Sequence, residues 1–390
     1  MTSFLAKIYA FKFFDSFILI FPLYAVMFVD AGLSPVEISV ALTAWSVTTF
    51  VLQIPAGMVA DRFSRRHVLA LAQAGRAAGF VLWLVWPHFW GFFIGLVLWG
   101  CKSAFTSGTF EALLFDELKA QGREGQYTRL IGRAQAVQAL GVLAASLCAA
   151  AVARFGYPVA LVASLAAIAL ASLAALALPP ADRTLLAHDQ SYLGQFRQGL
   201  VLALGHRVIL HILVFAALAV ALGGALEEFW PIFGVKIGLS HPAVALFVGV
   251  QYAAEAVASL LAHRTGRFGA RAFYILFAVA GAALLTAGAL FVPSAMALLA
   301  LYSALMKVVD VVFEGRLQQA IPSNQRATIG SVKGFAAQIG ISTLYMGFGP
   351  LAQATSYRVA FMACGVTGIV IGVAYLGWSL NAKSAQAGPA

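Results

Sequence analysis

Long apolar runs alternate with short polar breaks along the whole chain. Each run is about 20–27 residues long, and an α-helix of that length crosses the ~30 Å hydrocarbon core of a bilayer. The shorter segments of alternating polarity that a membrane β-barrel needs are not present in the sequence. The pattern therefore predicts an all-α integral membrane protein with twelve transmembrane helices. The predicted spans lie at approximately residues 4–29, 36–59, 68–88, 90–116, 128–153, 157–178, 207–234, 242–262, 272–292, 295–319, 327–352 and 357–380.

Composition supports this class of protein. Hydrophobic residues make up 62% of the chain and charged residues only 10%, whereas about a quarter of the residues of a soluble domain are charged. The first run carries Lys12 and Asp15 and lacks a small-residue cleavage site, so we interpret it as a membrane span and not as a signal peptide. The three cysteines all fall in apolar runs and indicate neither a disulfide framework nor a metal site.

The net charge of +10 would suit a nucleic-acid-binding protein, but its distribution indicates a membrane protein. With the N-terminus in the cytoplasm, three of the 25 Lys and Arg residues lie outside and three lie at membrane depth, and the others lie on or near the cytoplasmic side. This asymmetry follows the positive-inside rule. It predicts a multi-pass protein of the bacterial inner membrane with both termini in the cytoplasm, and it argues against a nucleic-acid partner.

The longest polar break, residues 179–206, divides the predicted spans into two sets of six. We interpret it as a cytoplasmic linker between an N-terminal six-helix bundle, 1–178, and a C-terminal six-helix bundle, 207–390. The halves resemble each other, because a shift of 202 residues lays 53–66 over 255–268 and two arginines of each segment then coincide. Repeats in the same orientation are typical of transporters whose two bundles move about a site near the membrane midplane.

A dense group of charges follows the second predicted span, in the stretch GMVADRFSRRHVL at 57–69. This stretch resembles the signature of the loop between helices 2 and 3 in the major facilitator superfamily, roughly G-x-x-x-D-R-x-G-R-R/K, with Ser64 in place of the glycine. The resemblance covers all twelve spans and implies the superfamily's two parallel six-helix bundles. FEALLFDEL at 110–118 also looks like the end of helix 4 in a bacterial branch that includes proposed exporters of drugs and small solutes, although the Gly-Pro-rich antiporter signature of helix 5 is absent. The matching loop residues are Gly57, Asp61, Arg62, Arg65 and Arg66.

These loop residues suit a conformational latch on the cytoplasmic side. Gly57 would let a neighbouring helix approach closely, and Asp61 would face the positive N-terminal end of another helix. The resemblance implies that this partner is the eleventh span, which begins near Thr328. We expect the arginines to pair with an acid that ends the fourth span, Asp116 or Glu117. The alternative is that the charges only anchor the loop on the cytoplasmic side.

Charges at membrane depth cost about 2.5–3.5 kcal/mol each, and here they gather on the first, fourth, seventh and tenth spans. In the superfamily these spans line the central cavity, so the resemblance places the charges at the substrate. Buried lysines need an anion as partner, and buried carboxylates can carry protons. The alternative is a structural ion ladder on the tenth span, where three of the charges follow at one-turn spacing. The candidates for substrate binding or proton coupling are Asp15, Lys102, Glu227, Glu228, Lys307, Asp310 and Glu314.

Three other charges near the same depth receive a different interpretation. Lys12 is expected to extend toward the inner interface. Glu111 lies nearer the cytoplasmic end of its span, where it belongs as readily to the latch as to the cavity. Arg76 is expected to pair within its own half.

The sequence indicates a transporter and not an enzyme. It contains no glycine-rich phosphate loop, which argues against ATP as the energy source, and no His or Cys cluster with metal-ligand spacing. We therefore expect a monomeric secondary transporter without cofactor or metal, whose partners are the lipid bilayer, a small-molecule substrate and protons. The favoured function is proton-coupled export of a small amphiphilic molecule, anionic or zwitterionic, by alternating access. The alternatives are uptake of a small solute or siderophore, lipid flipping, and a receptor that no longer transports.

Overall fold

The computed structural model describes residues 2–179, 192–321 and 326–386. Every regular element within these residues is a helix, as predicted for the fold class. The chain divides into two compact units, Met1–Gln190 with Ser240–Tyr252, and Ser191–Leu239 with Ala253–Ala390. Helix α12 therefore contributes its first half to the first unit and its second half to the second.

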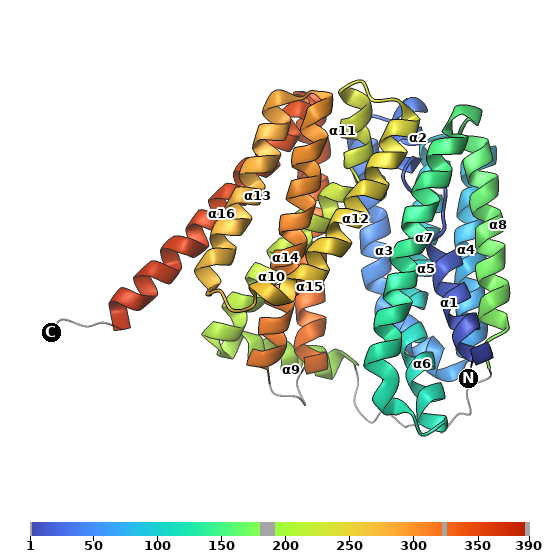
Figure 1. Cartoon of the computed structure of the whole chain (residues 1–390), viewed down its shortest axis with the longest axis horizontal. Helices are drawn as coiled ribbons and strands as arrows, with labels where there is room; N and C mark the ends of the chain where they lie inside the picture. The colour runs from blue at the N-terminus through green and yellow to red at the C-terminus, as the bar shows by residue number, and fades with distance from the viewer. Residues whose placement is uncertain (1, 180–191, 322–325, 387–390) are drawn as a thin grey trace. The chain divides into compact units, whose positions relative to one another are not determined.

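The first unit is built from long apolar helices (Figure 1). Its elements are α1 (Thr2–Ser16), α2 (Tyr24–Asp30), α3 (Pro35–Arg62), α4 (Arg65–Val85), α5 (Phe89–Thr106), α6 (Thr109–Ala120), η1 (Glu124–Gln126), α7 (Tyr127–Val152), η2 (Ala153–Phe155), α8 (Tyr157–Leu176) and the start of α12 (His241–Thr265). Helix α5 packs against α3 and α4, and α8 packs against α1 and α4. Helix α1 also packs along α7. Charged residues on α1, α4 and α5 can therefore meet inside one bundle.

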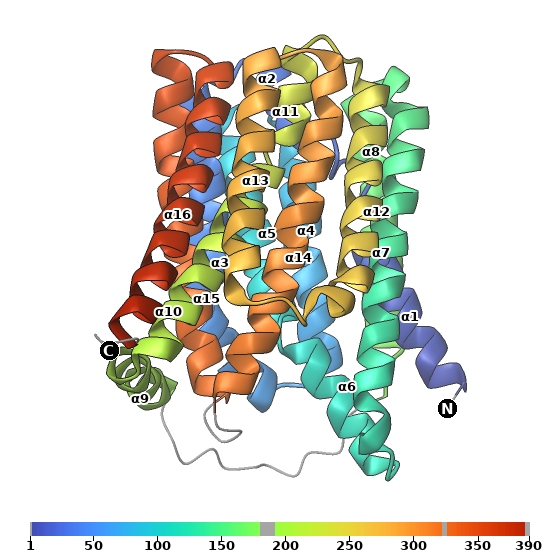
Figure 2. The same cartoon turned by 60° about the vertical axis from the view of Figure 1, so that its left-hand side comes forward.

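The second unit has the same all-helical construction. Its elements are α9 (Tyr192–Gly205), α10 (Arg207–Glu227), α11 (Trp230–Lys236), the end of α12, α13 (Ala270–Leu290), η3 (Pro293–Ala295), α14 (Met296–Ala320), α15 (Arg326–Ala354) and α16 (Tyr357–Gln386). Helix α10 packs against α14 and α15, and α13 packs against α14 and α16. Figures 1 and 2 both show α13 and α16 side by side. Residues 180–191 of the predicted linker lie outside the described residues, and its second half forms α9, which packs against α15.

Ten helices of the described residues are long and apolar enough to cross a membrane. They correspond one by one to ten of the predicted runs. The remaining two runs, 4–29 and 327–352, correspond to α1 with α2 and to α15. The order and approximate limits of the spans therefore agree with the hydrophobic pattern.

Three predicted spans are broken, and each break lies close to a candidate charge. The first span stops at Ser16 and resumes at Tyr24, the fourth is interrupted between α5 and α6, and the seventh between α10 and α11. Backbone groups freed by a break at membrane depth must find partners within the protein. In the first span the amide of Ile20 donates to the buried Ser164 Oγ of α8 at 3.0 Å. In the fourth, the amide of Gly108, whose φ is +75°, donates to Glu111 Oε2 at 3.0 Å.

Small residues bring some helix pairs into close contact. A Cβ atom added at Gly79 of α4 would lie 2.9 Å from the carbonyl oxygen of Gly95 on α5. In the second unit, a Cβ atom at Gly281 of α13 would lie 2.8 Å from the carbonyl oxygen of Gly365 on α16. Close approach at glycine is a common way to pack helices in membranes, where no hydrophobic effect drives them together.

Candidate functional site

Two arginines that follow the turn after α3 contact other helices, one through an ion pair and one at the C-terminal end of α8. Arg65, the first residue of α4, pairs with Asp116 on α6. Arg66 lies next to it, and its NH1 group is 3.5 Å from the carbonyl oxygen of Leu178, just beyond the end of α8. A cation at the C-terminal end of a helix is favourable, because unpaired carbonyl groups give that end partial negative charge. Both contacts hold ends of helices together within the first unit.

The structure describes only some of the other residues proposed for the latch. Arg62 ends α3 and is exposed, and Gly57 lies in the same helix. The side chains of Asp61 and Thr328 lie outside the described residues, so the contact expected between Asp61 and the eleventh span stays a prediction. Of the two acids considered as partners, Asp116 pairs with an arginine, whereas Glu117 accepts a hydrogen bond from Gln121 at 2.8 Å.

A buried polar group in the first unit, which we call the Asp15 cluster, contains Asp15, Gln73, Arg76 and Lys102. The Oδ1 atom of Asp15 lies 2.6 Å from Lys102 Nζ, 3.1 Å from Arg76 NH2 and 2.7 Å from the amide nitrogen of Gln73. Asp15 and Lys102 are each 8% exposed, Arg76 is 2% exposed and Gln73 is fully buried. One carboxylate oxygen thus receives three donors, two of them cationic.

The helices explain how these residues meet. Asp15 lies one residue before the end of α1, where the broken span also frees backbone carbonyls, and Arg76 NH1 donates to the carbonyl oxygen of Asp15 at 3.0 Å. Gln73 and Arg76 are one turn apart on α4, and the Gln73 side-chain oxygen accepts from Arg76 NH2 at 2.6 Å. Lys102 reaches the same carboxylate from α5. Residues three apart on a helix lie on one face, so α4 presents both side chains together.

The Asp15 cluster carries more positive than negative charge. Arg76 and Lys102 supply two cations, and Asp15 supplies one anion. Arg76 Nε is buried and has no acceptor within hydrogen-bonding distance among the described residues. A buried charge without a counter-ion is strongly destabilising. The cluster is therefore suited to accept one more anionic or hydrogen-bond-accepting group.

The sequence led us to expect that Lys12 extends toward the interface, but the structure shows it buried. It is 7% exposed, and its Nζ atom lies 4.0 Å from the centre of the Phe110 ring and 4.0 Å from Glu111 Oε1. A cation over an aromatic face is attracted to the ring quadrupole, and here the ring and a carboxylate replace water. Arg76 pairs within its own half, as expected.

The second unit holds a more exposed ion group, the Lys333 cluster, formed by Lys307, Asp310, Glu314 and Lys333. Lys307 Nζ is 3.7 Å from Asp310 Oδ2, one turn along α14. Lys333 of α15 lies 2.6 Å from Glu314 Oε2 and 3.9 Å from Asp310 Oδ1. The acids and Lys307 have side chains that are 30–43% exposed, whereas Lys333 is 14% exposed. The charges on α14 are thus bridged to α15.

Two further acids end α10. Glu227 is its last residue, Glu228 follows, and both are half-buried next to the break before α11. Among the described residues, no cation lies within ion-pair distance of Glu227, and its electrostatic neighbours are mainly acids: Glu228, Glu255 and Asp310, with Lys307 as the cation. Acids therefore outnumber cations among the electrostatic neighbours of Glu227, a balance opposite in sign to that of the Asp15 cluster.

Sequence reasoning missed two members of these groups. Gln73 was not singled out, although a glutamine at one-turn spacing before an arginine in an apolar helix is a recognisable signal. Lys333 was also missed, although it is a charged residue at the start of the eleventh run. No group of three or more His, Cys, Asp or Glu side chains with the arrangement of a metal site occurs in the part of the chain that the structure describes.

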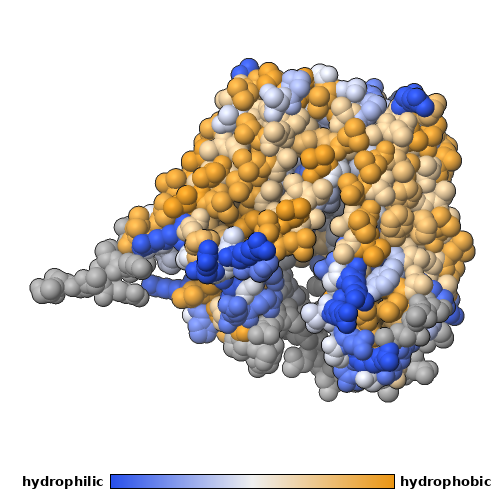
Figure 3. Space-filling model, viewed as in Figure 1, coloured by the Kyte–Doolittle hydropathy of each residue, from blue (hydrophilic) through white to orange (hydrophobic). Residues whose placement is uncertain are grey.

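The surface of the helices matches a lipid environment. Figure 3 shows hydrophobic residues over the middle of the helices of each unit and hydrophilic residues gathered near their ends. Large exposed hydrophobic side chains such as Leu71, Leu173 and Leu260 are ordinary in a bilayer and unusual in water.

Comparison with known proteins gives the family. The sequence profile of the Major Facilitator Superfamily matches residues 5–342, and no curated protein matches the chain. Similar solved structures include a mutant of the nucleoside transporter NupG (TM-score 0.80, 15% identity, 97% of this chain and 99% of that chain). Others are a D-xylose-proton symporter (TM-score 0.73, 15% identity, 96% of each chain) and a POT family transporter in complex with 5-aminolevulinic acid (TM-score 0.73, 13% identity, 97% and 96%). At these identities the structures show the shared fold, and the profile match over most of the chain shows that this multi-pass membrane protein belongs to the Major Facilitator Superfamily.

Proposed function

We propose that this chain is a proton-coupled secondary transporter of the bacterial inner membrane that takes up a small organic solute with an anionic or zwitterionic head. The observation that supports this proposal is the Asp15 cluster, in which two buried cations share one carboxylate. The site works by alternating access, in which the cluster faces first one and then the other side of the membrane.

Proton binding and anion binding favour each other in such a cluster. While Asp15 is ionised, it neutralises one of the two cations. When a proton binds to its carboxylate, Arg76 and Lys102 lose the counter-ion that they share, and an anionic group of the solute can replace it. When the solute leaves, Asp15 releases the proton and pairs with Lys102 again. Because proton and anion occupy the site together, they move in the same direction, and an inward proton gradient then drives uptake.

Export, the direction favoured by the sequence, remains as a second candidate because of the acids in the second unit. Glu227 has acids as its main neighbours, and a proton there would compete with a cationic group of the substrate. Competition gives exchange in opposite directions, and an inward proton gradient would then drive export. The D-xylose-proton symporter among the structural relatives is consistent with the first direction.

The test uses proteoliposomes that contain a pH-sensitive dye in the lumen. Monocarboxylates, amino acids, nucleosides and pentoses are added outside one at a time, without a pH gradient. Uptake by symport acidifies the lumen when the right solute is added, and exchange makes it alkaline. Asp15→Asn should abolish the solute-dependent pH change, and Glu124→Gln, an exposed acid of the same unit, should leave it intact. A full response in Asp15→Asn would refute coupling through this carboxylate.

A further inference from the structure

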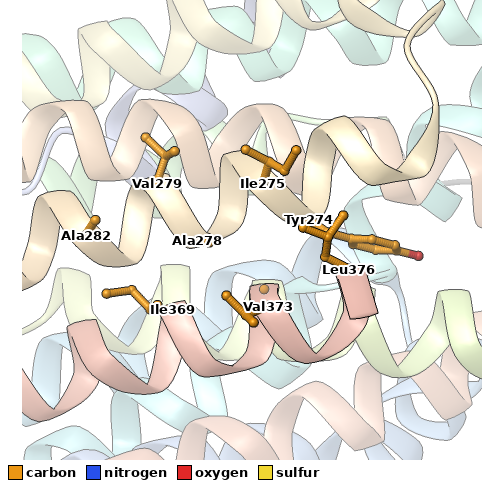
Figure 4. A pocket seen from close by; sticks show the side chains of 9 residues that line it. Tyr274, Ile275, Ala278, Val279, Ala282, Ile369, Val373 and Leu376 are labelled. Atoms are coloured by element: carbon orange, nitrogen blue, oxygen red, sulfur yellow. The ribbon is translucent and has the colours of Figure 1, made fainter. Parts of the chain in front are cut away.

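A shallow apolar groove runs between α13 and α16 in the second unit, with a volume of about 320 Å³. Figure 4 shows its lining side chains coming from the two helices, with Tyr274 and Leu376 at the same end. Ile275 and Val279 of α13 and Val373 of α16 form its walls. These three side chains are 47–56% exposed, so the groove opens outward to the surface of the unit.

The floor of the groove is closed by tight helix packing. A Cβ atom at Gly372 would lie 2.7 Å from the carbonyl oxygen of Tyr274 and 2.8 Å from the Cβ atom of Ala278. Nothing larger than glycine fits at this position, and the helices leave no passage into the bundle there. Both helices are candidate membrane spans, Ala270–Leu290 and Tyr357–Leu380. The groove therefore lies where acyl chains of the bilayer pack.

One end of the groove is polar and cationic. One turn beyond Tyr274, the guanidinium of Arg271 bridges the helices, because Nε donates to Ser379 Oγ at 3.2 Å and NH2 donates to the carbonyl oxygen of Ser379 at 2.8 Å. Trp378 is 52% exposed beside it and stacks on His211 with ring centroids 3.8 Å apart. A half-exposed tryptophan and an arginine at the end of an apolar span are typical of the headgroup level.

No acid of the surrounding sequence neutralises this end. Residues 256–309 and 357–390 contain neither Asp nor Glu, and this range includes the whole of α13 and α16. Arg264 and Arg267 precede Arg271 and are exposed. The distribution of Lys and Arg marks this end as cytoplasmic. Basic sites between membrane helices on the cytoplasmic side attract anionic lipid headgroups.

We propose that the α13–α16 groove binds one acyl chain of an anionic phospholipid of the inner leaflet, with the phosphate of its headgroup against Arg271. The apolar walls select a hydrocarbon chain, and the uncompensated cation at the groove's end selects an anionic headgroup over a zwitterionic one. The lipid covers the seam at which α13 and α16 meet.

Native mass spectrometry of the purified, delipidated protein tests this proposal. Dioleoyl phosphatidylglycerol and dioleoyl phosphatidylcholine are titrated separately, and the dissociation constant of the first bound lipid is measured. We expect phosphatidylglycerol to bind about fivefold more tightly than phosphatidylcholine, because one cation near an anionic headgroup contributes a factor of about this size. Val373→Trp should fill the groove and weaken binding of both lipids by about tenfold. Val370→Trp is the matched control, because Val370 is a similarly exposed valine of α16 that does not line the groove.

A second pair of variants tests the headgroup contact without filling the groove. Arg271→Gln should lower the affinity for phosphatidylglycerol to that for phosphatidylcholine. Arg358→Gln is its control. Arg358 also links α16 to α13, because its Nε donates to the carbonyl oxygen of Gly288, but this contact lies at the opposite end of both helices. Equal affinities of the two lipids, or a preference that survives Arg271→Gln, would overturn the proposal. A dimer that dissociates in the Val373→Trp variant would also overturn the proposal, because the groove would then bind a second copy of the chain and not a lipid.

Discussion

The unequal charge of the Asp15 cluster predicts that its three ionised residues contribute very differently to stability. Asp15→Asn keeps the shape of the side chain but leaves Arg76 and Lys102 buried together without an anion. Lys102→Met removes one cation and leaves a balanced pair, in which Arg76 still donates to both the side chain and the backbone of Asp15. We therefore expect Asp15→Asn to be the most damaging substitution and Lys102→Met the least.

The magnitudes follow from burial. Asp15, Arg76 and Lys102 are all at least 92% buried, so water screens them little. Removing one partner of a buried pair costs about 3–5 kcal/mol, whereas replacing a buried ion by an apolar group of similar size is often neutral or stabilising. Asp15→Asn should lower the free energy of unfolding by about 3–5 kcal/mol, and Lys102→Met should change it by less than about 1 kcal/mol. The difference in free energy of unfolding between the two variants corresponds to a factor of at least about 30 in the ratio of folded to unfolded protein.

Reversible unfolding in mixed micelles, followed by circular dichroism, measures these differences. The double variant Asp15→Asn with Lys102→Met should be more stable than Asp15→Asn alone, by about 1–3 kcal/mol, because one of the two uncompensated cations is gone. Lys102→Met should also lose solute-dependent proton movement while keeping its fold. Should Lys102→Met unfold the protein as readily as Asp15→Asn, or the double variant show no recovery, the cluster would not carry an excess cation and the proposed anion site would fail with it.

Three shorter predictions concern other contacts. Exchanging the charges of the latch pair, Arg65→Asp with Asp116→Arg, should restore the transport rate that either single change lowers, and a rate as low as that of the single variants would exclude a role for the pair. Lys333→Met should destabilise the second unit by only about 1 kcal/mol in the same unfolding assay, because Glu314 is 43% exposed and water screens it; a loss above about 3 kcal/mol would contradict this. Ser164→Ala should cost about 1–3 kcal/mol, because it leaves the buried amide at the break of the first span without an acceptor, and a loss below about 0.5 kcal/mol would show that the amide finds another partner.

The hydrophobic pattern predicted most of the fold because a bilayer imposes one simple rule. Each span must be a helix about 30 Å long, so the order of spans follows directly from run lengths. The pattern did not predict that the first, fourth and seventh spans are broken. The break that follows Ser16 in the first span depends on Ser164 of α8, which accepts the freed amide of Ile20 from 144 residues away in the sequence. Such compensation depends on tertiary contacts that a linear pattern does not contain.

For the candidate site, the sequence indicated several of the residues but not the ion pairs that they form with one another. Asp15 and Lys102 were singled out separately because each is costly at membrane depth, but periodicity could not show that they share one oxygen atom with Arg76. That pairing changes the interpretation, because Lys102 already has a protein carboxylate as partner, and the proposed mechanism frees it for a substrate by protonating that carboxylate. Lys307 differs, since its contact with Asp310 is longer and its side chain is 39% exposed. The two lysines near the middles of the fourth and tenth spans thus differ in burial and in partners, and the proposed coupling of anion binding to a proton rests on the buried one.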